Sequence, residues 1–122
     1  MIVLDTNIVI YYLQGNSDIV NWLERELKND SHIALSALSV VELLGFPKIT
    51  ADEQFLINQL FRTILIVDVD FSIAREAARI RREQKLKTID SVIAATAVIL
   101  HAPLVSRDMV FKHIRDIEVI VP

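Results

Sequence analysis

Short, almost continuously apolar segments alternate with helical patterns along this chain, and the alternation restricts the fold more than any other feature. A strand with one face in water alternates apolar and polar side chains, whereas a strand buried on both faces does not. Strands of the second kind, joined by helices, are typical of a mostly parallel sheet covered on both sides. We therefore predict an α/β fold, a three-layer α/β/α sandwich with about five strands. The predicted strands are 2–4, 32–35, 64–69, 104–106 and 117–121.

Capping residues predict where the helices begin. Thr50 and Glu53 have the spacing of a capping box, so a helix is expected to about residue 62, with Phe55, Leu56 and Leu60 facing the core. Ser39 and Glu42 match the same pattern before a short helix that ends at Gly45. The other expected caps are Ser17 or Asp18 for a second helix, Asp70 for a helix over 71–86, Thr88 for a helix over 89–101, and Asp108 for a brief helix over 109–112.

The size and composition exclude several classes of protein. A chain of 122 residues has room for one core, so we expect a single domain over 1–122. Cysteine is absent, which excludes disulfides, thiolate zinc sites and cysteine nucleophiles and favours a cytoplasmic location. The longest apolar run, 92–100, is far shorter than the roughly 20 residues that cross a bilayer. The first segment meets an acid at Asp5 and has no basic leader, unlike a signal peptide.

The net charge of −3 argues against a protein that coats nucleic acid by electrostatics alone. The distribution is uneven, because residues 75–87 carry six basic and two acidic side chains, which makes this stretch +4 and the remainder −7. Two interpretations of the stretch stay open. It is either a solvated helix face with local ion pairs or a surface that contacts phosphates.

Four acids, Asp5, Glu42, Asp90 and Asp108, fall where predicted strands end or the next helices begin. Ligands of open parallel sheets bind at the carboxyl ends of the strands, so all four side chains are expected at one edge. Each acid alone has a simpler explanation, since carboxylates stabilise helix N-termini. That explanation is weakest for Asp90, because Thr88 is the better cap of its helix.

Carboxylates that gather at one edge repel each other. Two unit charges 4 Å apart repel by roughly 4 kcal/mol at an effective dielectric of 20, so such a cluster needs protonation, separation or a cation. Ligands that are all oxygen suit Mg²⁺ or Mn²⁺, both of which also accept phosphate oxygens. The acids therefore favour metal-assisted phosphate chemistry as a hypothesis.

Four motifs, IVLDTNIVI, ALSVVELLG, TIDSVIAATAVIL and SRDMVF, stand in the order and spacing of a known family. On these motifs the chain resembles PIN-domain proteins over essentially its whole length, and among them the VapC-type toxins of prokaryotic toxin–antitoxin pairs. The resemblance implies catalytic and metal-binding roles for the acidic quartet Asp5, Glu42, Asp90 and Asp108. It also implies supporting hydroxyls at Thr6 and Ser106, and Asn7 completes the DTN motif. Ser106 stands where the family commonly has Thr.

The activity that the resemblance implies is a Mg²⁺- or Mn²⁺-dependent endoribonuclease that hydrolyses RNA with metal-activated water. Arg79, Arg82 and Arg107 are the candidates for contacts with flanking phosphates. The resemblance further implies a cognate antitoxin and a homodimer. The aromatic residues Tyr11 and Tyr12 are expected to pack rather than to contact RNA.

Other functions remain open at this point. The fold could serve as a catalytically silent module that only binds a partner. A phosphatase of the haloacid-dehalogenase type also places a nucleophilic Asp after its first strand, but its usual second acid corresponds to Asn7 here. A receiver-like module would use Asp68 or Asp70 after the third strand, yet it also needs an acidic pair where this chain has Asp5 and Thr6.

Overall fold

Five parallel strands form one sheet in the computed structural model, which describes residues 1–122. The strands are β1 (Ile2–Leu4), β2 (Ile33–Ser36), β3 (Leu65–Val67), β4 (Leu104–Val105) and β5 (Val119–Ile120), in the order β3-β2-β1-β4-β5. After β1, the chain adds β2 and β3 on one side of β1, and then adds β4 and β5 on its other side. The strand order therefore reverses between β1 and β4, and their carboxyl ends mark the expected ligand crevice.

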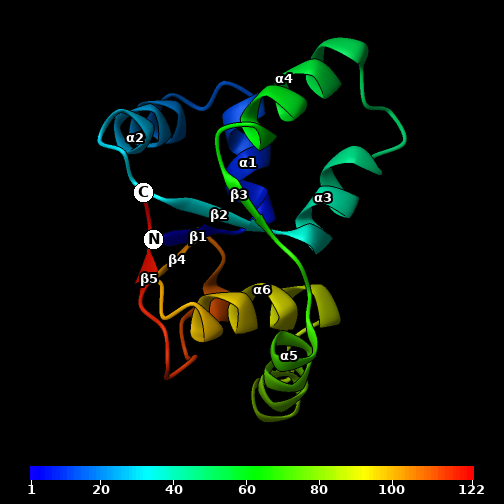
Figure 1. The fold of residues 1–122 in the computed structure, drawn as a ribbon, viewed down its shortest axis with the longest axis vertical. Helices are drawn as coiled ribbons and strands as arrows, with labels where there is room; N and C mark the ends of the chain where they lie inside the picture. The colour runs from blue at the N-terminus through cyan, green and yellow to red at the C-terminus, as the bar shows by residue number, and fades with distance from the viewer.

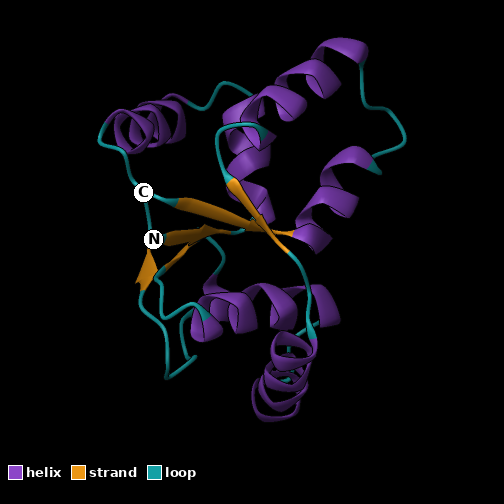
Figure 2. Ribbon diagram, viewed as in Figure 1, coloured by secondary structure: helices purple, strands orange, loops and turns teal.

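Helices lie on both sides of the sheet, which confirms the predicted three-layer sandwich (Figure 1). On one side are α1 (Thr6–Leu13), α2 (Ser17–Lys28), α3 (Ala37–Leu44) and α4 (Ala51–Phe61). On the other are α5 (Phe71–Gln84) and α6 (Thr88–Ile99), while the short 3₁₀ helix η1 (Met109–Phe111) follows β4. Figure 2 shows the strands as a thin layer between these two groups of helices. No helix combines the length and the apolar character needed to cross a membrane.

The sheet separates two apolar cores, which explains why its strands are almost continuously apolar. Successive strand residues point to opposite faces. Val3 packs into the core beneath α5 and α6, and the next residue, Leu4, packs into the core beneath α1, α2 and α4. Both side chains are fully buried. Burying a side chain of this size contributes about 1.5–3 kcal/mol, so neither face tolerates polar residues there.

The structure confirms the predicted caps Thr50, Asp70 and Asp108, whose side chains accept hydrogen bonds from backbone N–H groups. Three other helices begin earlier than predicted. Ser36 caps α3, so Ser39 lies inside the helix and forms no capping box with Glu42. The N-cap residue of α6 is Lys87 rather than Thr88, and that of α2 is Asn16 rather than Ser17 or Asp18.

The predicted buried face of α4 is partly wrong. Phe55 and Leu56 are 61% and 49% exposed, whereas Ile57 and Leu60 are buried. The predicted strands 64–69 and 117–121 are also shorter in the structure, because only 65–67 and 119–120 pair with a neighbouring strand.

Candidate functional site

A buried carboxylate lies where the strand order reverses. Asp5 follows β1 and Ser106 follows β4, and they are 3% and 0% exposed. The hydroxyl of Ser106 donates to Asp5 Oδ2 at 2.8 Å and accepts a hydrogen bond from the backbone N–H of Asp108 at 2.9 Å. Although Asp5 precedes α1, its side chain makes no capping hydrogen bond. Helix capping therefore does not explain why an acid stands at position 5. The Ser106 hydroxyl also links the segment that carries Asp5 to the segment that carries Asp108.

A second hydroxyl holds the acid from α3. Thr6 Oγ1 lies 2.6 Å from Glu42 Oε1 and 2.8 Å from Ser39 Oγ. Thr6 and Ser39 are buried, whereas Glu42 is exposed. The first residue of α1 thus fixes one oxygen of Glu42. Ser39, which the sequence pattern placed at a helix cap, instead supports this contact from one turn earlier in α3.

The acids meet around one pocket of about 440 Å³. Its lining includes Asn7, Glu42, Asp90 and Asp108. Asp5 lies beside this pocket, because the Ser106 hydroxyl is hydrogen-bonded both to Asp5 and to the backbone N–H of Asp108. In this conformation no three carboxylate or imidazole side chains stand close enough to hold one ion directly. The donors nevertheless suit Mg²⁺ or Mn²⁺, because Mg²⁺ keeps several waters and binds proteins through one or two carboxylates.

The electrostatics of the pocket are those of an anionic cluster. Burial raises the pKa of Asp5 to about 6, against the lowering effect of the Ser106 hydroxyl, and the charges of Asp90 and Asp108 raise it further. Burial also raises the pKa of Asp90, with added repulsion from Asp108 and Glu42 and partial relief from Lys87. Perturbed carboxyl groups that cluster in a cleft are typical of functional sites, and a bound cation would remove much of this repulsion.

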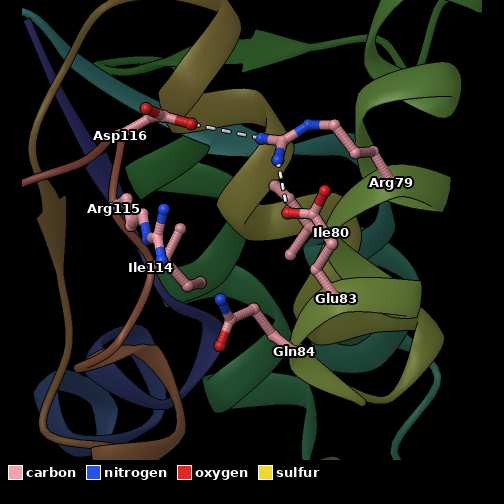
Figure 3. Close-up of a pocket in the computed structure, with 7 residues that line it drawn as sticks. All are labelled: Arg79, Ile80, Glu83, Gln84, Ile114, Arg115 and Asp116. Atoms are coloured by element: carbon pink, nitrogen blue, oxygen red, sulfur yellow. Dashed lines mark hydrogen bonds and ion pairs between the residues drawn. The ribbon is translucent and has the colours of Figure 1, made fainter.

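The three arginines expected to contact phosphates lie in different places. Arg79 donates to Glu76. It also donates to Glu83 at 2.7 Å and to Asp116 at 3.2 Å, as Figure 3 shows. This network borders a separate cavity of about 490 Å³ that shares no residue with the acidic pocket. Because three carboxylates already bind its guanidinium, we expect Arg79 to contribute little to phosphate binding, which a measurement of RNA affinity would test. Arg82 is exposed on α5 and also lies outside the lining of the acidic pocket.

Arg107, in contrast, borders the site. It lines a pocket of about 370 Å³ together with Asn7 and Asp108. Its guanidinium carbon is 5.5 Å from the centre of the Tyr11 ring. Tyr11 is half-buried, so it packs as expected but also supports Arg107. Lys87, the last residue of the basic stretch 75–87 and not one of the three arginines singled out from the sequence, also lines the acidic pocket.

Comparison with known proteins agrees with this architecture. A family model described as the PIN domain matches residues 2–117. No curated protein sequence gives a match. A chain of the VapBC2 complex from Rickettsia felis, bound to promoter DNA, is 27% identical with a TM-score of 0.85, over 99% of this chain and 98% of that one.

Two further solved structures are similar. A toxin–antitoxin complex from Klebsiella pneumoniae contains a chain 26% identical to this one, with a TM-score of 0.81, over 98% of this chain and 96% of that chain. A chain of FitAB bound to a DNA fragment is 30% identical, with a TM-score of 0.78, over 100% of this chain and 95% of that chain. The chain therefore belongs to the PIN-domain family and resembles the VapC-type toxins within it.

Proposed function

We propose that the protein is a metal-dependent endoribonuclease that acts in the cytoplasm as the toxin of a toxin–antitoxin pair. The observation that carries the proposal is the gathering of Glu42, Asp90 and Asp108 around one pocket, with buried Asp5 beside it at the reversal of strand order and the pKa values of Asp5 and Asp90 raised. Such a cluster is costly unless a cation binds there. Phosphodiester hydrolysis is the reaction that a Mg²⁺ or Mn²⁺ site of this kind supports best.

In this proposal Asp5 and Asp90 are the principal ligands, and Glu42 and Asp108 hold a second ion or orient water. Ser106 and Thr6 keep the carboxylates of Asp5 and Glu42 in place through their hydrogen bonds. Hydroxyls that orient ligands in this way commonly strengthen metal binding. A bound Mg²⁺ or Mn²⁺ supplies charge neutralisation, which lets a polyanion approach, and a bound water of lowered pKa.

The solved complexes support a cognate antitoxin as the partner of this chain, because the Rickettsia felis structure is a VapBC assembly and the Klebsiella pneumoniae structure is a toxin–antitoxin complex. An apolar cavity of about 220 Å³ lies between α1, α3 and α4 and has Glu42 in its lining. A partner segment that fills this cavity would reach the acidic pocket, so the antitoxin is proposed to cover the site. The exposed apolar side chains of Val41 and Phe46 on and beside α3 would be buried in such a contact or in a homodimer.

The test is cleavage of RNA by the purified protein with Mg²⁺ or Mn²⁺. We expect cleavage to disappear when a chelator is added and in Asp90→Asn, which keeps the size of the side chain and removes its charge. The matched control is Asp30→Asn, because Asp30 is exposed beyond α2 and has a positive φ of 55° that Asn also adopts. No cleavage by the unmodified chain, or equal cleavage by Asp90→Asn, would reject the nuclease and leave a PIN fold that binds a partner.

A further inference from the structure

A second pocket adjoins the acidic pocket. The first, of about 440 Å³, and the second, of about 370 Å³, share Asn7 and Asp108 in their linings. The second pocket is completed by Tyr11, Arg107 and Met109. The two cavities therefore lie next to each other at the carboxyl end of the sheet, with Asn7 and Asp108 between them.

A cation with a restricted position stands in the second pocket. The Nε of Arg107 donates to the main-chain oxygen of Pro122 at 3.1 Å, and the guanidinium carbon lies 5.5 Å from the centre of the Tyr11 ring. The terminal nitrogens of Arg107 make no hydrogen bond, and their one acidic neighbour, Asp18, is 4.0 Å away and 81% exposed. The side chain is thus oriented by the protein while its terminal N–H groups stay available. Arginine in this state is well suited to a bidentate contact with phosphate.

A second cation stands at the acidic pocket. Lys87 is exposed, lines the acidic pocket and forms no ion pair within 4.0 Å. The basic helix α5 next to it behaves differently, because Arg79 there is bound by three carboxylates. Two cations therefore stand beside the acids, one in each pocket: Lys87, which forms no ion pair, and Arg107, whose one ion pair is the long contact with exposed Asp18.

We propose that Lys87 and Arg107 bind backbone phosphates on opposite sides of the scissile phosphate, so that single-stranded RNA runs from Lys87 across Asn7 and Asp108 to Arg107. This inference rests on the proposed nuclease function and adds the track of the substrate. Met109 is 67% exposed in the Arg107 pocket and offers an apolar wall for an unstacked base. A single strand suits this track better than a duplex, since unpaired bases can turn into pockets and pack against side chains there.

The test measures how strongly the affinity for RNA depends on salt. A short, unstructured, fluorescein-labelled RNA is titrated with protein in the Asp90→Asn background with Mg²⁺, and binding is followed by fluorescence anisotropy from about 50 to about 200 mM salt. Lys87→Gln and Arg107→Gln are compared with Lys28→Gln and Arg115→Gln. These controls remove exposed cations at the end of α2 and beside the separate Arg79 cavity.

Each contact with a single strand contributes about 0.7 to the slope of log affinity against log salt. We expect Lys87→Gln and Arg107→Gln each to lower the slope by about 0.7 and to weaken binding about fivefold near 0.1 M salt. The double variant should lose about 1.4 from the slope, and the controls should lose nothing. Arg107→Lys should keep the slope, because lysine carries the same charge. If the guanidinium of Arg107 had only a structural role, lysine would not replace it and the slope would fall as in Arg107→Gln.

Slopes for Lys87→Gln and Arg107→Gln that match those of the controls would overturn the proposed track. The result is separable from the nuclease proposal, because binding is measured without cleavage. An unmodified protein that cleaves RNA while both variants keep the full slope would reject the track alone. Reduced slopes in a protein that cleaves nothing would support the track and reject the nuclease.

Discussion

The carboxylate of Asp5 should destabilise the metal-free protein at neutral pH, so Asp5→Asn should make it more stable. Asp5 is 3% exposed, and its one side-chain partner is the hydroxyl of Ser106. Asn is nearly the same size, carries no charge and offers a carbonyl oxygen to the same hydroxyl. The substitution therefore removes the buried charge with little change in packing.

The size of the effect follows from the pKa. Burial and neighbouring carboxylates raise the pKa of Asp5 from its ordinary 3.8 to about 6, which at 1.36 kcal/mol per pKa unit corresponds to about 3 kcal/mol. The folded state holds this proton more tightly than the unfolded state, so stability is greatest below the unfolded pKa and falls as pH rises through the folded pKa. Asp5→Asn should gain up to about 3 kcal/mol at pH above 7, and the gain should vanish near pH 3.8.

The assay is urea unfolding and thermal unfolding, both followed by circular dichroism at a series of pH values with a chelator present. A gain of this size would raise Tm by on the order of 10 °C at neutral pH. Asp30→Asn serves as the control, since Asp30 is exposed. An Asp5→Asn variant that is no more stable than the unmodified protein at neutral pH, or whose advantage persists unchanged in acid, would refute the reasoning.

Three further predictions concern the ion, the core and the basic helix. Thr6→Val removes the hydroxyl 2.6 Å from Glu42 and should weaken Mg²⁺ binding about 10–100-fold, measured by calorimetric titration; unchanged affinity would show that Thr6 does not orient a ligand. Ile93→Ala, at a 1% exposed position of α6, should lower the free energy of unfolding by about 2–5 kcal/mol in urea titrations, and a loss under 1 kcal/mol would contradict the packing described. Arg79→Gln should leave RNA affinity unchanged in the anisotropy assay, because its guanidinium is bound to carboxylates; a clear loss would restore Arg79 as a phosphate contact.

The sheet could be predicted from sequence because burial on both faces leaves a direct mark on each strand. Helix starts were harder where two serines compete. Ser36 and Ser39 stand three residues apart, and Ser39 has an acid at the capping-box distance in Glu42. The choice between them is made by pairing of Ser36 with Val67 of β3, which extends β2 to residue 36. Local patterns contain no information about such a distant partner.

The location of the acids could be predicted for a similar reason, because parallel strands bring their carboxyl ends to one edge. The hydrogen bond from Ser106 to Asp5 could not be predicted from residue patterns, because it joins residues 101 positions apart. The full set of partners of Arg79 could not be predicted from the charges within α5, because it includes Asp116, which lies 37 positions away. Charge patterns indicate which side chains are cationic, and only the fold shows which of them are already paired.

The two buried hydroxyls of Ser106 and Thr6 orient two of the four acids through contacts that do not involve an ion. Ser106 connects Asp5 with the backbone of Asp108 across the reversal of strand order, and Thr6 fixes Glu42 from the start of α1. Neither contact depends on the charge of an ion. Thr6 directly follows Asp5 in the sequence, and Ser106 stands two positions before Asp108. Repulsion alone would drive the carboxylates apart toward water. These hydroxyls therefore allow the fold to position two of its acids before an ion arrives, so that less reorganisation is needed when it binds.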